Sequence, residues 1–191
     1  MGQLYESIAP ALEQWIKLQH LFFVATAPLA KTGHVNCSPK GLDSLRILSP
    51  TSVAYLDLTG SGAETLAHLR ENGRIVFMFC ALNGPPKIVR LHGTGRIVTK
   101  RAAEWLDLAP LFPPYPAQRS IIIAEVTRVS DSCGFGVPKF EFQENRDAME
   151  RWAATKGQAA LPEYRKLKNV HSIDGLPGLD TSDASQETPS K

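Results

Sequence analysis

A glycine-rich turn leading into a helical segment carries the strongest chemical pattern in this sequence. The turn Thr59–Gly62 (T-G-S-G) precedes residues 63–72, whose apolar spacing is typical of a helix. Ser61 and Glu64 have the spacing of a capping box, in which each side chain accepts the other residue's backbone N–H. Alternatively, small residues, free N–H groups and the helix dipole form an anion site, to which Ser61 and Thr65 add hydroxyl donors. The local sequence leaves both interpretations open.

The turn does not match the phosphate-binding loops of the common nucleotide-binding folds. Gly60-Ser61-Gly62 begins like G-x-G-x-x-G, but Thr65 stands where the third glycine belongs. The next strand-like run ends without the acidic residue of a dinucleotide site, and no lysine follows in P-loop spacing. The sequence therefore argues against dinucleotide and nucleoside triphosphate sites at this turn.

A second segment can bring complementary groups to the turn. Residues 34–41 (H-V-N-C-S-P-K-G) alternate, so Asn36 and Ser38 share one face of a strand while Cys37 lies on the other. Lys40 follows at the end, where its ammonium can meet an anion as a point charge. The common alternative is a polar strand face that ends in a solvated lysine.

The segment 87–98 also has two distinct faces. Arg90, His92, Thr94 and Arg96 alternate with small and apolar residues. A strand face this polar is either exposed to solvent or covered by a polar partner. A second chain and a cofactor would satisfy it equally well.

Other residue types give weaker signals. The five histidines are dispersed, without the spacing of metal ligands, so we expect no metal site. Cys133 has no identifiable base near it in the sequence, and a packing role is the simpler interpretation.

Short strands with a few helices between them must position these residues. Strand-like runs occur at 21–27, 34–38, 45–48, 53–58, 74–82, 87–98 and 120–129, and helical spacing occurs at 3–19, 63–72, 100–108 and 144–156. The runs 74–82 and 87–98 are joined by Asn83-Gly84-Pro85-Pro86, which favours a hairpin. The pattern predicts an antiparallel α+β domain, and a small six-stranded barrel would protect its edges.

Length and composition bound the organisation of the chain. Its 191 residues predict one domain over 1–170, followed by an acidic tail rich in Ser, Pro and Gly over 171–191. A net charge of +2 with 43% hydrophobic residues excludes a disordered chain and disfavours a nucleic-acid-coating protein. The longest apolar run, 75–82, is too short to span a bilayer. Three scattered cysteines indicate a reduced, cytoplasmic protein.

Several segments, in order along the chain, resemble the pyridoxamine 5′-phosphate oxidase-related, FMN-binding split-barrel family. They are V-N-C-S-P-K-G (35–41), Y-L-D-L-T-G-S-G-A-E-T (55–65), I-V-R-L-H-G-T-G-R (88–96) and S-C-G-F-G-V-P (132–138). The likeness is greatest to small family members of uncertain activity, which share the later S-I-D-G-L-P-G-L (172–179).

The resemblance implies a six-stranded split β-barrel homodimer that binds FMN in clefts at the subunit interface. It implies an FMN-dependent oxidoreductase acting on an unidentified small substrate, without nucleic acid or membrane as partner. The alternatives are a non-catalytic flavin-binding or interaction protein, and a split-barrel relative that uses deazaflavin or haem. The implied cofactor-binding residues are Asn36, Cys37, Ser38, Lys40, Thr59, Gly60, Ser61, Gly62, Glu64, Thr65 and Arg90. No catalytic residue is assigned.

The sequence departs from the true oxidases at two places. Lys40 matches the basic residue that ends the equivalent strand, but the oxidases carry an Arg-Lys pair near Glu64 and Thr65. They also end in an arginine-containing segment that binds substrate, whereas this chain ends in Asp and Ser. We therefore do not expect efficient oxidation of pyridoxamine 5′-phosphate.

Overall fold

Antiparallel strands form one continuous sheet in the computed structural model, which describes residues 2–157 and 160–185. The strands are β1 (Leu4–Tyr5), β2 (Phe22–Thr26), β3 (Asn36–Lys40), β4 (Leu45–Ser49), β5 (Ser52–Leu58), β6 (Arg74–Cys80), β7 (Ile88–Thr99) and β8 (Gln118–Ser132). Their order is β3-β2-β6-β7-β8-β5-β4, with the short β1 paired to β8. The antiparallel α+β class is confirmed, although these residues form eight strands rather than six.

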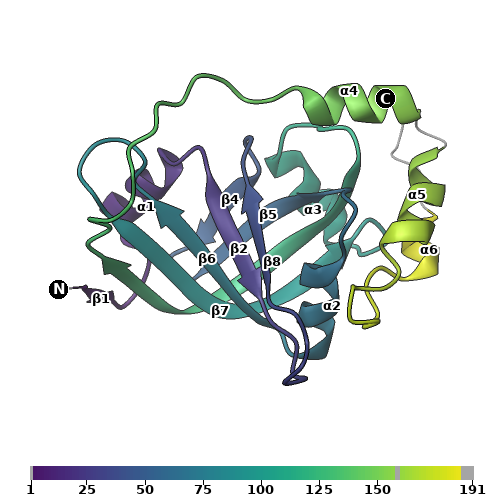
Figure 1. The fold of residues 1–191 in the computed structure, drawn as a ribbon, viewed down its shortest axis with the longest axis horizontal. Coiled ribbons are helices and arrows are strands. Elements are labelled where there is room, and N and C mark those ends of the chain that lie inside the picture. Colours follow the sequence, from purple (N-terminus) through teal and green to yellow (C-terminus); the bar gives the residue numbers. More distant parts are fainter. Residues whose placement is uncertain (1, 158–159, 186–191) are drawn as a thin grey trace.

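The sheet curls until its two ends approach each other (Figure 1). β3 and β4 end the strand order, yet Lys40 Nζ in β3 lies 3.7 Å from Asp57 Oδ1 in β5. Side chains therefore connect the sheet across this gap, which we call the β3–β5 split.

Helices cover the open ends and one side of the barrel. They are α1 (Pro10–Lys17), α2 (Glu64–Glu71), α3 (Trp105–Leu108), α4 (Ala148–Lys156), α5 (Ala160–Lys168) and α6 (Thr181–Ala184), with a 3₁₀ turn at Ala109–Leu111. In Figure 1, α1 and α2 lie at opposite ends of the barrel, and α4, α5 and α6 stand to one side. None of the helices in the described part of the chain is long and apolar enough to cross a bilayer.

The core occupies the barrel interior and continues outside it under α3. Leu12 and Ile16 of α1 and Leu66 of α2 join the interior cluster, which closes the barrel at both ends. In β8, Ile122 faces this interior while Ile121 and Ile123 pack in a second cluster. The continuous apolar run of β8 is explained by this burial on both faces.

The N-terminal prediction of one helix over residues 3–19 is wrong in part. Leu4–Tyr5 pairs with β8 instead, and the helix begins at Pro10, where a proline needs no hydrogen-bond acceptor for its nitrogen. Apolar spacing alone did not reveal that the first residues add to a sheet edge.

The C-terminal residues do not form the free tail that their composition suggested. Leu179 and Ala184 are buried in the interior cluster with 2% and 0% exposure, and Ala184 is the last residue of α6. A few buried apolar residues anchor this otherwise polar segment. The average composition of the segment does not reveal them. The end of the expected tail, 186–191, lies outside the described residues.

Candidate functional site

The inner face of β3 carries a chain of hydrogen bonds toward α2. Asn36 donates from Nδ2 to Thr65 Oγ1 at 3.0 Å, and Ser38 Oγ donates to Asn36 Oδ1 at 2.8 Å. Cys37 points the opposite way and is exposed. The alternation expected from the sequence is therefore present, and it brings Asn36, Ser38 and Thr65 together.

Lys40 ends this face and reaches across the β3–β5 split. Its Nζ lies 3.7 Å from Asp57 Oδ1 and 5.6 Å from the centre of the Tyr55 ring. About a quarter of the Lys40 side chain, 24%, remains exposed. Lys40 is therefore positioned by a buried carboxylate while its ammonium keeps partial access to solvent.

Asp57 is fully buried and binds a second cation. Its Oδ2 accepts from Arg119 Nε at 2.7 Å and from Ser120 Oγ at 3.1 Å. Burial alone would raise the pKa of this carboxyl, but the charges of Arg119 and Lys40 and these hydrogen bonds outweigh it and lower the pKa. Asp57 is consequently ionised at neutral pH.

Two buried oxygen atoms at the split have no hydrogen-bond partner among the described residues. They are Tyr55 Oη and Asp57 Oδ1. Burial, followed by the nearby Asp57 charge, raises the pKa of Tyr55 well above its usual value, so the phenol stays protonated. The split therefore contains a buried hydroxyl without a hydrogen bond in the described residues, next to a carboxylate oxygen that is ion-paired with Lys40.

The glycine-rich turn directs its carbonyl groups inward. Gly60 O accepts from Asn169 Nδ2 at 2.8 Å, and Gly62 O accepts from Arg119 Nη1 at 2.8 Å. Thr59 is buried, and its hydroxyl donates to a backbone carbonyl and accepts from Arg165 Nε at 2.9 Å. The inner side of the turn is thus fully engaged within the chain.

The outer side of the turn is open. Ser61 is exposed, and a Cβ added at Gly60 would meet no atom within 4 Å. A Cβ at Gly62 would instead meet the Glu64 carboxylate, which would have to move aside. The Gly60–Ser61 side of the turn is therefore open to a ligand.

The capping-box interpretation of this turn is wrong. Ala63 is the N-cap of α2, and no side chain caps the helix. Glu64 reaches outward and accepts the Ile173 N–H at 3.2 Å. The reason is that the helix begins at Glu64, so this residue occupies the first helical position rather than the third position that a capping box requires.

Arg90 and Cys37 lie apart from the rest of the candidate set. Arg90 pairs with Met78 across β6 and β7, and Met78 pairs with Phe23 in β2, so these side chains share the outer face of the sheet. Arg90 Nη1 donates to Ser132 Oγ at 3.0 Å on that face. The structure therefore separates Arg90 and Cys37 from the other candidate residues, which lie on the inner face of β3, at the glycine-rich turn and at the start of α2 and which we call the inner group.

Sequence reasoning missed the residues that organise the inner group. No role was predicted for four residues that hold Lys40 and the glycine-rich turn in place. They are Asp57, Arg119, Arg165 and Asn169. A usable signal existed, because Asp57 interrupts a buried apolar strand and such a charge is almost always paired. Its partner could not be identified, since Arg119 lies 62 positions away.

No group of three His, Cys, Asp or Glu side chains within residues 2–157 and 160–185 could hold a metal ion.

Comparison with known proteins places this chain among relatives. The family model described as pyridoxamine 5′-phosphate oxidase matches residues 8–133. The pyridoxamine 5′-phosphate oxidase family protein ustO of Aspergillus flavus is 40% identical, with 95% of this chain and 80% of that protein covered.

Two solved structures share the fold. A HupZ variant from Group A Streptococcus matches with a TM-score of 0.50 and 23% identity, over 65% of this chain and 99% of that one. A protein of Lactobacillus delbrueckii assigned to the pyridoxamine 5′-phosphate oxidases matches with a TM-score of 0.50 and 19% identity, over 65% and 94%. Because the family model and the fungal relative together span most of the chain, this protein belongs to the pyridoxamine 5′-phosphate oxidase family.

Proposed function

We propose that this protein is a homodimeric flavoprotein that binds FMN and uses it to oxidise or reduce a small substrate. The observation that carries the proposal is the family match over residues 8–133, which includes every candidate cofactor-binding residue. A bound flavin would supply the electron chemistry, and the protein would supply binding, orientation and electrostatics.

The residues of the inner group fit the polar parts of FMN. Lys40 offers a cation on a partly exposed side chain, beside the Tyr55 hydroxyl and ion-paired with Asp57 Oδ1. Ser61 offers an exposed hydroxyl on the open side of the turn. In this assignment Lys40 and Ser61 bind the cofactor, while Asp57 orients Lys40 through their ion pair.

The phosphate contacts must differ from those of the true oxidases. Glu64 and Thr65 stand near the Arg-Lys pair of those enzymes, and both are used inside this chain. Glu64 accepts the Ile173 N–H, and Thr65 accepts the Asn36 amide. A carboxylate also repels a phosphate. We therefore propose that Lys40 and Ser61, rather than residues 64 and 65, hold the FMN phosphate.

The first experiment identifies the ligand released from the purified protein by absorbance spectrum and mass. FMN supports the proposal, whereas a deazaflavin or haem overturns it in favour of those cofactors. Reduction of the bound flavin by a reduced nicotinamide or a candidate substrate, with recovery in air, distinguishes an enzyme from a non-catalytic flavin-binding protein.

The second experiment places the phosphate by titrating FMN and riboflavin into wild type and Ser61→Asp. Because Ser61 caps no helix, the apo protein should melt at an unchanged temperature. A carboxylate about 4 Å from the phosphate costs about 1–4 kcal/mol, depending on solvent screening, so FMN affinity should fall at least fivefold. Riboflavin, which lacks the phosphate, should bind equally to both proteins.

Two lysine variants accompany this titration: Lys40→Ala is a second test of the site, and Lys31→Ala is its control. Lys40→Ala should weaken FMN binding by about 1.5–3 kcal/mol if the ammonium donates to the cofactor. Lys31→Ala, at an exposed lysine between β2 and β3, should leave affinity unchanged. Unchanged FMN affinity in both Ser61→Asp and Lys40→Ala would place the phosphate elsewhere.

A further inference from the structure

A large cleft lies beyond the end of β3, next to the candidate site but formed by other residues. Its volume is about 1320 Å³. Three parts of the chain form its walls: the end of α1, the turn between β6 and β7, and residues 140–149. Phe140 N donates to Leu82 O at 2.8 Å, which joins the second wall to the third. A backbone contact therefore helps to preform the cleft.

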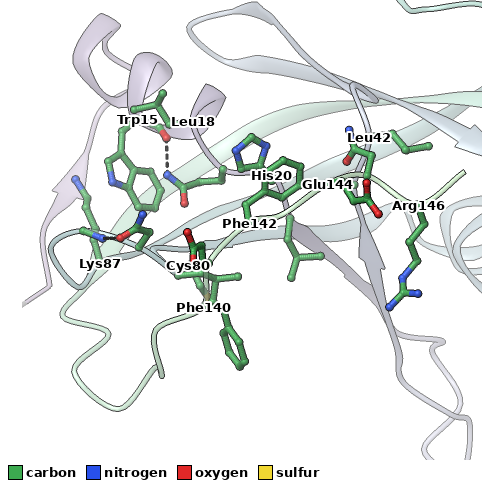
Figure 2. Close-up of a pocket in the computed structure, with 18 of the residues that line it drawn as sticks. Trp15, Leu18, His20, Leu42, Cys80, Lys87, Phe140, Phe142, Glu144 and Arg146 are labelled. Carbon is green, nitrogen blue, oxygen red and sulfur yellow. Dashed lines mark hydrogen bonds between the residues drawn. The ribbon is translucent and has the colours of Figure 1, made fainter.

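Aromatic side chains converge on this cleft from separate elements. Trp15 and His20 come from the α1 wall, and Phe140 and Phe142 come from the third wall. The rings of His20 and Phe142 stack nearly parallel, with centroids 3.7 Å apart and an angle of 10°. In Figure 2 this pair lies between Trp15 at one end and Glu144 and Arg146 at the other.

The phenylalanines of the third wall retain much exposed ring surface. Phe142 is 46% exposed in spite of its stack on His20, and Phe140 is 60% exposed. Aromatic rings normally bury their faces against other rings or apolar groups. The exposed surfaces of these two cleft-lining rings are available for stacking with a flat apolar group.

The charged residues of the lining do not favour an ion. Lys87 is already paired with Asp131 at 3.5 Å and lies 5.5 Å from the Trp15 ring centre. Glu144 and Arg146 carry opposite charges at the same end of the cleft, and Glu141 adds a second carboxylate to the lining. These charges disfavour an anion, and the aromatic lining favours an uncharged molecule.

The only cysteine that lines the cleft, among the residues described, is Cys80. Burial raises the pKa of its thiol, with a smaller opposing effect from Arg90. Because the thiolate is the reactive form, Cys80 is not activated toward a bound molecule. Cys80 therefore gives no reason to expect a covalent bond to a ligand in this cleft.

We propose that this cleft binds an uncharged, planar aromatic molecule that stacks beside the His20–Phe142 pair. The volume exceeds the usual range of roughly 300–1,000 Å³ for small-molecule sites, so a bicyclic or larger ring system fits. Gly41 and Leu42, directly after Lys40, belong to the lining, which puts the ligand close to the inner group. The proposal does not depend on flavin binding.

Calorimetric titration of the full chain with 2-naphthol and decahydro-2-naphthol tests the proposal. The two probes share a hydroxyl and a bicyclic frame, but only the first is flat and aromatic. We expect 2-naphthol to bind at least tenfold more tightly. Equal affinities, or no binding of 2-naphthol up to its solubility limit, would overturn the proposal.

Matched variants locate the probe. Phe142→Ala should weaken 2-naphthol binding roughly tenfold, since one stacking contact and its apolar burial are lost. Phe142→Tyr, which keeps the ring, should retain the affinity. Phe135→Ala removes an exposed phenylalanine of the same connecting segment that does not line the cleft, and it should have no effect. An unchanged affinity in Phe142→Ala would overturn the assignment.

Two further measurements distinguish the proposed ligand from two other occupants of the cleft, a flavin and a second copy of the chain. Saturating FMN should not displace 2-naphthol, and displacement would mean that the cleft is the flavin site itself. In sedimentation velocity, Phe142→Ala should leave the oligomeric state unchanged. Dissociation of a dimer by this variant, together with absent probe binding, would identify the cleft as an interface between two copies and overturn the proposal.

Discussion

Among single residues, Asp57 has the greatest influence on the candidate site. It binds Arg119 and faces Lys40 from within the barrel, and it has no exposed surface. Through Arg119, which donates to Gly62 O, the same network supports the glycine-rich turn. Removal of this one charge should therefore affect both the stability and the proposed cofactor site.

Asp57→Asn should lower the free energy of unfolding by about 3–5 kcal/mol. The physical reason is that Arg119 stays buried without its counter-charge. Urea denaturation measures the change. Asp43→Asn is the control, because it breaks the solvent-exposed pair with Arg46 and should cost less than about 1 kcal/mol. Equal losses in the two variants would contradict the buried ion-pair network.

The pH dependence of stability should carry the signature of Asp57. Its pKa is lower in the folded protein than in the unfolded chain, so its stabilising contribution is complete above the unfolded value of about 3.9. The contribution is lost as pH falls through the folded pKa. Unfolding free energies measured from about pH 6 downward should therefore decline less steeply in Asp57→Asn than in wild type. Parallel curves would show that other carboxylates dominate acid unfolding.

Residue alternation along β3 was readable from the sequence, but the contacts of the site were not. A strand's period of two requires Asn36 and Ser38 to share a face. The capping box is absent because α2 begins at Glu64, and the Glu64 carboxylate instead accepts the Ile173 N–H from 109 positions later. Spacing rules describe local partners only, and most contacts of the turn come from distant segments.

At the level of elements, the segment 169–180 fastens α2 to the barrel. Asn169 binds the turn at Gly60, Ile173 binds Glu64, and Asp180 pairs with Arg70 in α2. Asp174 also accepts the backbone N–H of His34, before β3. The segment is thus a structural part of the domain.

Leu179→Ala should destabilise the protein by about 2–5 kcal/mol. Leu179 is 2% exposed in the interior cluster, and its truncation leaves a cavity. Leu167→Ala, at a leucine of α5 that is 76% exposed, should change stability by less than about 0.5 kcal/mol. Thermal or urea unfolding distinguishes the two, and a negligible effect of Leu179→Ala would mean that the segment packs loosely.

Most strands could be predicted from the sequence to within two or three residues. Apolar and β-branched runs bounded by turn residues gave β5, β6 and β7, and the hairpin between the last two is confirmed. The short β1 and the packed segment near Leu179 could not be predicted, because each depends on a partner far along the chain. The average composition of such a segment does not show which of its residues is buried by a distant partner.

At the level of the whole molecule, the outer face of β2 and β6 is the surface that we expect to form the homodimer. Phe23 and Met78 are paired across the two strands on this face. Val35, in the loop before β3, is 72% exposed. Apolar surface of this kind on a sheet is typical of a protein interface.

Met78→Asp should therefore convert a dimer into a monomer, measured by light scattering at micromolar concentration. A charge buried in an apolar interface is unpaired and costs several kcal/mol. Leu106→Asp alters an equally apolar but 78% exposed residue on α3, and it should leave the dimer intact. A monomeric wild type with flavin still bound would refute the homodimer.

The contacts of the segment 169–180 also determine when the domain can be completed during synthesis. Asn169 and Asp174 meet residues 109 and 140 positions earlier in the chain. The strands and α2 leave the ribosome long before this segment, so the nascent barrel presents the start of α2 and the glycine-rich turn uncovered. Such distant contacts slow folding. In refolding experiments with pulsed hydrogen exchange, amides at the start of α2 should gain protection last. Early protection there would show that the helix docks on the barrel before the segment 169–180 packs on it.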